Sequence, residues 1–90
     1  MKPVTLPVTL YVTPSCGYCQ VVGRLLADKG VDFEEVDLSA EPERRAEMVA
    51  RAKGAVTVPQ VFVGGEHVGG LSEIWELDRT GKLDPILAGG

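Results

Sequence analysis

Cys16 and Cys19 are the residues of this 90-residue chain whose type and spacing could do chemistry, and they are its two cysteines. Thiol–disulfide exchange requires a thiolate, and an ordinary cysteine is mostly protonated at neutral pH. Cys16 stands where a helix is expected to begin, and the free N–H groups and dipole of a helix N-terminus favour a negative sulfur. Cys19 follows nearly one turn later on the same face, within reach of a disulfide. We therefore predict that Cys16 is the nucleophile and that Cys19, more buried and with a higher pKa, resolves mixed disulfides.

Metal binding is the main alternative for such a pair, as one half of a zinc site. Zinc takes four ligands, and the one histidine, His67, lies far along the chain on an expected strand. A disulfide across two intervening residues closes too short a loop to stabilise a fold by much. The pair also falls at a strand-to-helix junction inside an expected β-α-β unit, where this spacing is typical of redox proteins. Redox cycling is therefore the favoured interpretation, with no mononuclear metal site.

The elements that must position the cysteines follow from hydrophobic periodicity and from the glycines and prolines. Strands are expected over residues 8–12, 31–38, 58–63 and 66–68, with a two-residue Gly64-Gly65 hairpin between the last two. Helices are expected over 17–29, from Pro42 to Gly54 and from a Ser72 cap to Gly81, with a last helical turn at 83–87. The order β-α-β-α-β-β-α predicts an α/β fold with a four-stranded mixed β-sheet flanked by helices, in a single domain over 1–90.

Helical spacing also predicts which side chains are buried. The expected core faces are Val22, Leu25 and Leu26 in the first helix, Ala46, Val49 and Ala50 in the second, and Leu71, Ile74, Trp75 and Leu77 in the third. His67 is expected to face solvent.

Composition and charge exclude several classes of partner. The chain has 13 acidic and 9 basic residues, a net charge of -4, which disfavours binding to nucleic acid or to anionic membranes. It has no run of 18 apolar residues that could cross a membrane. We expect a cytoplasmic protein with neither nucleic-acid nor membrane partners.

Three segments in the right order resemble a glutaredoxin: YVTPSCGYC at 11–19, TVPQVFV at 57–63 and GGLSE at 69–73, with GKLDP at 81–85 extending the match. The resemblance implies a thioredoxin-like fold, glutathione as co-substrate, and reduction of protein disulfides and glutathionylated proteins. The substrate-binding residues it implies are Thr13, Tyr18, Thr57, Val58, Pro59, Gly70, Leu71, Ser72 and Glu73.

The same resemblance assigns particular roles. Pro59 corresponds to the family's cis-proline, which would turn the Val58 N–H and C=O towards an extended glutathione; otherwise it is an ordinary trans proline at a strand start. Ser72, with the N–H groups of its helix, would hold the γ-glutamyl carboxylate, or would be a cap alone. Gly70, with Gly69, would allow close ligand approach or make a turn. Tyr18 would flank the substrate or pack on the surface.

Two departures from the family open further possibilities. Thr13 and Ala55 occupy places where many members carry a lysine and an arginine, so glutathione should bind more weakly, or Arg45 or Lys53 should replace those cations. Gly17 replaces the commoner proline, as in relatives that carry a [2Fe–2S] cluster in a glutathione-bridged dimer through the first cysteine, here Cys16.

We therefore expect a glutathione-dependent oxidoreductase, monomeric unless a cluster makes it a dimer. The two alternatives are the cluster carrier and a thioredoxin-like electron donor that is reduced by a flavoprotein and ignores glutathione.

Overall fold

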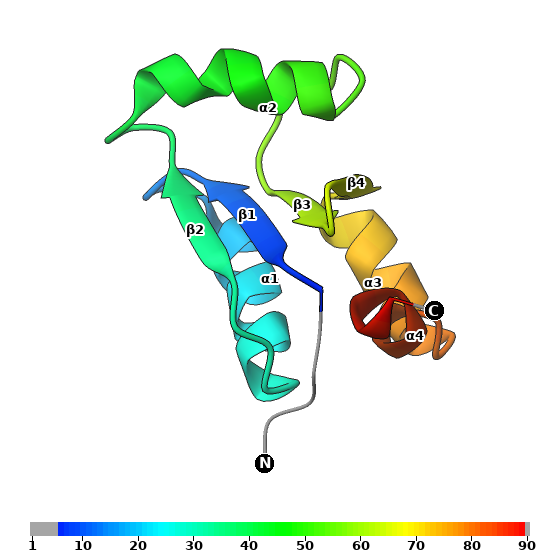
Figure 1. Cartoon of the computed structure of the whole chain (residues 1–90). Coiled ribbons are helices and arrows are strands. Elements are labelled where there is room, and N and C mark those ends of the chain that lie inside the picture. Colours follow the sequence, from blue (N-terminus) through cyan, green and yellow to red (C-terminus); the bar gives the residue numbers. More distant parts are fainter. Residues whose placement is uncertain (1–5, 90) are drawn as a thin grey trace.

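A single four-stranded sheet with helices on both faces makes up the protein, whose computed structural model describes residues 6–89 (Figure 1). The elements are β1 (Val8–Val12), α1 (Gly17–Asp28), β2 (Glu34–Asp37), the 3₁₀ turn η1 (Pro42–Arg44), α2 (Arg45–Arg51), β3 (Gln60–Val63), β4 (Glu66–Gly69), α3 (Leu71–Arg79) and α4 (Leu83–Ala88). The expected order of elements is confirmed, although β2 and β3 begin later than predicted. The domain expected over 1–90 extends at both ends beyond the described residues. Within 6–89, no helix is long and apolar enough to cross a membrane.

The sheet is mixed, as predicted, with strand order β2-β1-β3-β4. The β1–α1–β2 crossover pairs β1 and β2 in parallel, with Tyr11 opposite Val36. The β1–β3 and β3–β4 pairs are antiparallel. Gly64 and Gly65 both have positive φ, 59° and 88°, the backbone that a two-residue hairpin turn needs and that glycine adopts without strain. Strand β1, which lies between β2 and β3, ends at Val12, and α1 begins five residues later at Gly17.

Alternation along β1 divides the core between the two faces of the sheet. Leu10 and Val12 belong to a large cluster formed with α1, α3 and α4, whereas Tyr11 faces α2. The large cluster comprises Val8, Leu10, Val12, Cys19, Val22, Leu26, Val31, Val61, Val63, Ile74, Leu83 and Leu87. The smaller one comprises Tyr11, Val36, Leu38, Met48, Ala52 and Phe62. The face that carries α1 and α3 is thus the more thoroughly apolar.

Some predicted core positions are wrong. Trp75 is 58% exposed, because Ile74 occupies the core and the next helical position turns about 100° away from it. The predictions for Leu25, Leu71 and Leu77 hold in part, because these side chains are half-buried and pack against the large cluster. In α2 the buried residue is Met48, followed one turn later by Ala52. The predicted stripe fails there, since Ala46 and Ala50 are exposed and Val49 is only half-buried.

Candidate active site

Cys16 is the residue that caps α1. Strand β1 ends at Val12, and a short turn brings the Cys16 N–H to the Thr13 carbonyl oxygen at 3.2 Å. Cys16 has an extended backbone, and its Sγ accepts the Cys19 N–H at 3.1 Å. The sulfur therefore takes the place that a serine or aspartate oxygen takes in an ordinary N-cap. The predicted position at a helix start is confirmed.

Cys16 and Cys19 are joined by a disulfide, with their Cα atoms 5.2 Å apart. The two residues differ in access. Cys19 is 3% exposed within the large core cluster, while Cys16 is half-buried at its edge. An incoming sulfur can therefore approach Cys16 far more readily than Cys19, which confirms the predicted difference in burial.

The segment before β3 forms a second wall of the site. The Val58–Pro59 peptide bond is cis, as the resemblance implied. Cys16 Sγ lies 3.9 Å from the Val58 carbonyl oxygen, across 42 residues of sequence. Peptide groups of an irregular segment are thus placed directly beside the reactive sulfur.

The start of α3 forms the third wall. Gly70 is its N-cap, and Glu73 Oε1 accepts the Gly70 N–H at 2.7 Å. The prediction that Ser72 caps this helix is wrong, because Glu73 already reaches back to the cap from the third helical position. Ser72 lies instead in the first turn, where the N–H groups of residues 71–73 have no carbonyl partner within the helix.

The two glycines before α3 are required by close packing within the protein. Gly69 has φ 129°, and a Cβ there would lie 2.6 Å from Glu73 Oε1. A Cβ on Gly70 would lie 3.0 Å from the Pro59 carbonyl oxygen, a backbone atom that cannot easily move. The Gly69-Gly70 pair therefore allows the N-terminus of α3 to lie against the cis-proline segment.

Two cavities, of about 450 and 530 Å³, are lined in part by residues from the N-terminal half of α1. The larger has a volume of about 530 Å³ and is lined by Tyr18, Thr57, Val58, Pro59, Gln60, Gly70, Leu71, Ser72 and Glu73. Neither cysteine is part of its lining; we call it the dithiol cavity because Cys16 Sγ lies 3.9 Å from the carbonyl oxygen of Val58 in its wall. The structure brings eight of the nine predicted substrate-binding residues together there. Thr13 is the exception: it lines the other cavity, of about 450 Å³, with Cys19 and residues of β2.

Gln60 is a cavity residue that the sequence reasoning missed. It is only 5% exposed, and its side chain donates to Thr57 Oγ1 at 3.4 Å and accepts from His67 Nε2 at 2.6 Å. The expectation that His67 faces solvent holds only in part, since the side chain is half-buried and its ring packs on Phe62 with centroids 5.1 Å apart. A polar residue directly after Pro59 in an otherwise apolar run was the available signal.

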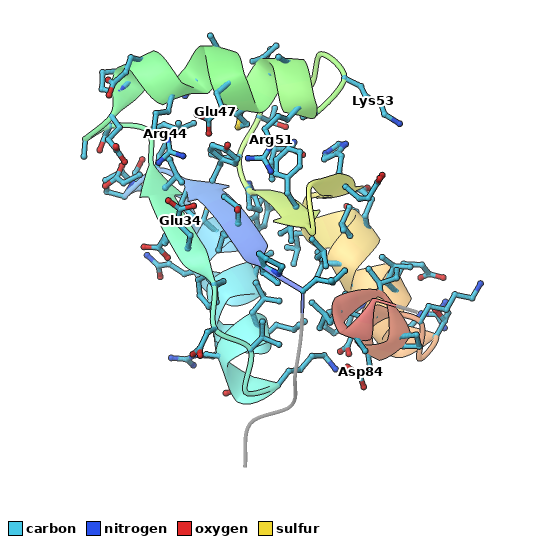
Figure 2. The ribbon with its side chains drawn as sticks, in the orientation of Figure 1. Glu34, Arg44, Glu47, Arg51, Lys53 and Asp84 are labelled. Carbon is cyan, nitrogen blue, oxygen red and sulfur yellow. A yellow bond between two sulfur atoms is a disulfide. The ribbon has the colours of Figure 1, made fainter. Side chains whose placement is uncertain are left out.

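The basic residues near this site differ in how far they are already engaged. Arg45 Nη1 donates to the Val56 carbonyl oxygen at 2.9 Å, one residue before Thr57. Arg44 is tied to Glu47 at 3.0 Å, whereas Lys53 extends outward beyond the end of α2 (Figure 2). Within the described part of the chain, no three His, Cys, Asp or Glu side chains are grouped to hold a metal ion.

Comparison with known proteins agrees with this geometry. The fold is of the thioredoxin-like class, and the model of the glutaredoxin family matches residues 8–68. The chain is 48% identical over 82 residues to a glutaredoxin of Pseudomonas aeruginosa, covering 91% of this chain and 96% of that one. The solution structure of a glutaredoxin from Brucella melitensis is 46% identical, with a TM-score of 0.80 over 93% of this chain and 90% of that one.

A third similar protein is known with glutathione. The crystal structure of a buckwheat glutaredoxin–glutathione complex is 33% identical, with a TM-score of 0.84, covering 93% of this chain and 78% of that one. The chain belongs to the glutaredoxin family. With its Cys-X-X-Cys pair, it is a thiol–disulfide oxidoreductase.

Proposed function

We propose that this protein uses glutathione to reduce protein disulfides and glutathionylated proteins. The observation that carries the proposal is the position of Cys16 Sγ, at the N-cap of α1 and 3.9 Å from the Val58 carbonyl oxygen at the edge of the dithiol cavity. A cavity of this size, with peptide groups on one side and a helix N-terminus on the other, suits a small anionic peptide.

Glutathione would lie across the dithiol cavity with its sulfur at Cys16. Its extended backbone would pair with the N–H and C=O of Val58, as a strand pairs with an exposed edge. Its γ-glutamyl carboxylate would accept the free N–H groups at the start of α3 and the Ser72 hydroxyl. Tyr18, 67% exposed on the cavity wall, would flank the peptide.

The reaction on a glutathionylated protein begins when the Cys16 thiolate attacks the glutathione sulfur and the protein thiolate leaves. A second glutathione thiolate then attacks that same glutathione sulfur, which releases glutathione disulfide and restores Cys16. On a protein disulfide, Cys16 forms a mixed disulfide with the protein instead. Cys19 displaces the protein, and two glutathiones reduce the resulting Cys16–Cys19 disulfide in sequence.

Single-cysteine variants test this division of labour. Cys16→Ser should lose all turnover on both substrate classes, because it removes the attacking sulfur. Cys19→Ser should retain deglutathionylation and lose most of its reduction of protein disulfides. Full activity without Cys16 would refute the mechanism. Reduction by a flavoprotein but not by glutathione would identify the thioredoxin-like donor instead.

We further propose that Arg45, rather than Lys53, replaces the family's missing cations at the glycine-end carboxylate of glutathione. Its guanidinium is anchored on the Val56 carbonyl oxygen and so lies beside the segment that would pair with glutathione. Arg45→Ala should raise KM for glutathione about threefold to tenfold, and Lys53→Ala, which removes the same charge, should change it less than twofold. An equal effect of both variants would contradict the assignment.

A second candidate function is transport of a [2Fe–2S] cluster. Apart from its neighbours in the chain, nothing lies within 4 Å of the position that a Cβ on Gly17 would occupy, so the residue directly after Cys16 faces open space. Cys16 of the reduced protein would be the single ligand from each chain, and glutathione and a second copy would complete the set. Visible absorption bands and a dimeric mass after anaerobic purification with glutathione would support this function. A colourless monomer would exclude transport of a cluster.

The cytoplasmic location stays a prediction.

A further inference from the structure

An apolar stripe leads out of the dithiol cavity into a neighbouring groove. On α1, Tyr18, Val21 and Leu25 are spaced i, i+3 and i+7, and on α3, Leu71 and Trp75 are spaced i and i+4. Residues with these spacings lie on one side of a helix. Tyr18 and Leu71 line the dithiol cavity, while the other three line an adjoining groove of about 410 Å³, which we call the α1–α3 groove. The two hollows therefore share one apolar path.

The side chains along this path are unusually exposed. The large hydrophobic residues that lie exposed in the described chain are Leu6, Tyr18, Val21, Val56 and Trp75. Three of them, Tyr18 at 67%, Val21 at 47% and Trp75 at 58%, fall on the stripe. Exposed aromatic residues gathered beside a reactive group are typical of a surface that another protein covers.

The charges around the α1–α3 groove favour a neutral occupant. Its charged lining residues are Arg24, Asp28, Lys29 and Asp78, two of each sign. Lys29 Nζ is already bound to Asp78 at 2.6 Å and to Asp84 at 2.9 Å. The charged residues that line the groove therefore carry no net charge. A bound partner would be recognised mainly by the apolar surface of Val21, Leu25 and Trp75.

The chemistry at Cys16 determines which partner reaches this surface. The reacting sulfur of a protein disulfide must meet Cys16 Sγ, and a polypeptide that runs from there along α1 passes over Tyr18 and into the groove lined by Val21 and Leu25. Resting on the proposed function, we propose that the α1–α3 groove is the docking site for disulfide-bearing protein substrates and accepts an apolar side chain near their reactive cysteine. Glutathione has no such side chain, and its proposed position between Val58 and the start of α3 leaves the α1–α3 groove free.

Helix geometry gives the spacing of that side chain from the cysteine. From Cys16, at the N-cap of α1, to the midpoint between Val21 and Leu25 is seven residues, about 10 Å along the helix. An extended chain spans the same distance in about three residues. The preferred substrate therefore carries an apolar residue about three positions from its reactive cysteine.

Matched peptide dimers, each joined by one disulfide, test the proposal. Two pairs carry either leucine or serine three positions before, or three positions after, the disulfide-bonded cysteine, and kcat/KM is measured with glutathione. The wild-type protein should prefer leucine about tenfold in at least one pair. Trp75→Ala should reduce that preference to within about twofold. Glu76→Ala should retain it, because Glu76 is an exposed neighbour on α3 outside the groove.

These outcomes separate the docking proposal from the proposed function. Absence of turnover on every peptide would refute the glutathione reaction. Turnover with no preference for leucine, or a preference that survives in Trp75→Ala, would refute docking in the groove alone.

A trapped complex provides a readout that does not depend on glutathione. In the Cys19→Ser variant, Cys16 attacks the cysteine sulfur of a peptide 2-pyridyl disulfide, thiopyridone leaves, and the Cys16–peptide disulfide persists because Cys19 is absent. Trp75 is the chain's single tryptophan. Its fluorescence emission should shift to shorter wavelength in the leucine conjugate relative to the serine conjugate. Identical spectra for the two conjugates would contradict docking against Trp75.

Discussion

The two faces of the sheet are held by different kinds of interaction, although the same strand, β1, contributes to both. On the face of α1, α3 and α4, the buried residues are almost entirely aliphatic. On the face of α2, Tyr11 is completely buried, but its hydroxyl donates to Glu47 and accepts from Arg51 Nη1 at 2.8 Å. The first face therefore depends mainly on apolar burial, with the ion pairs of Lys29 to Asp78 and Asp84 at its edge, and the second on burial combined with a polar network.

The network on the α2 face is continuous. Arg44 Nη2 donates to the Glu47 carboxylate at 3.0 Å, and the Arg51 guanidinium lies over the Phe62 ring, 4.4 Å from its centroid. Arg44, Glu47 and Arg51 all lie between α2 and the strands (Figure 2). A short helix with one fully buried residue, Met48, is thus attached to the sheet by hydrogen bonds, ion pairs and a cation–π contact.

The two sides of the site therefore differ in how strongly their positions depend on pH and salt. The dithiol is carried by the N-terminal part of α1, whose position depends mainly on apolar packing that pH and salt hardly change; the Lys29 ion pairs lie at the other end of the helix. The cis-proline segment is reached through α2, whose attachment responds to both. Low pH or high salt should therefore disturb the position of Val58 before it disturbs the position of Cys16.

The largest expected effect comes from a cavity on the aliphatic face. Leu26 is fully buried on α1, so Leu26→Ala should lower the free energy of unfolding by about 2–5 kcal/mol in denaturant titrations. The loss should be the same at low and high salt. A loss below about 1 kcal/mol, or one that varies with salt, would show that this face is not held by burial.

A smaller effect is expected from removing one hydroxyl on the α2 face. Tyr11→Phe keeps the ring and its edge-to-face contact with Phe62 but deprives Glu47 and Arg51 of a partner. The free energy of unfolding should fall by about 1–2 kcal/mol, since both partners retain some access to water. The difference from wild type should narrow at high salt. A neutral or stabilising substitution would contradict the role given to the network.

The smallest effect concerns acid. The hydrogen bonds from Arg44 and then from Tyr11 hold the pKa of Glu47 below its ordinary value. A group with a lowered pKa in the folded state stabilises the protein above its unfolded-state value, about 4.3, and loses that contribution as pH falls through the folded-state value.

Glu47→Gln should therefore make the decline in unfolding free energy between about pH 5 and 3 shallower, by less than about 1 kcal/mol because the carboxylate is 39% exposed. Some decline should remain, since hydrogen bonds from the Ser39 hydroxyl and N–H also lower the pKa of Asp37. An unchanged slope would exclude Glu47 as an acid-sensitive attachment. Unfolding at a series of pH values provides the measurement.

The sequence predicts the aliphatic face better than the α2 face. In α1, Val22 and Leu26 repeat at helical spacing and are buried as expected, and Leu25, the third predicted residue, is half-buried. In α2, alanines occupy several positions, so no apolar stripe stands out, and the buried turn from Met48 to Ala52 is decided by what Tyr11 and Phe62 present across the sheet. Contacts 36 to 40 residues apart in sequence, such as Tyr11 with Glu47 and Arg51, leave no local signal.

The site shows the same contrast. The two cysteines follow a strand and begin a helix, a pattern that is visible in the local sequence, and so the position of Cys16 could be predicted. The cap of α3 could not, because Gly70 serves only where Glu73 reaches back and where Pro59 lies close enough to exclude a side chain. Helical spacing predicts both Ile74 and Trp75 in the core, but Ile74 is fully buried and Trp75 is exposed.

The most direct test of the account is the ionisation of Cys16. In the reduced protein, the rate of alkylation by iodoacetamide is measured against pH, with Cys19→Ser as the control that isolates one sulfur. The N-terminus of α1 and the Cys19 N–H should stabilise the thiolate, so the rate should reach its midpoint well below the value of about 8.5 for a free cysteine. A midpoint at or above that value would contradict the claim that the helix start activates Cys16.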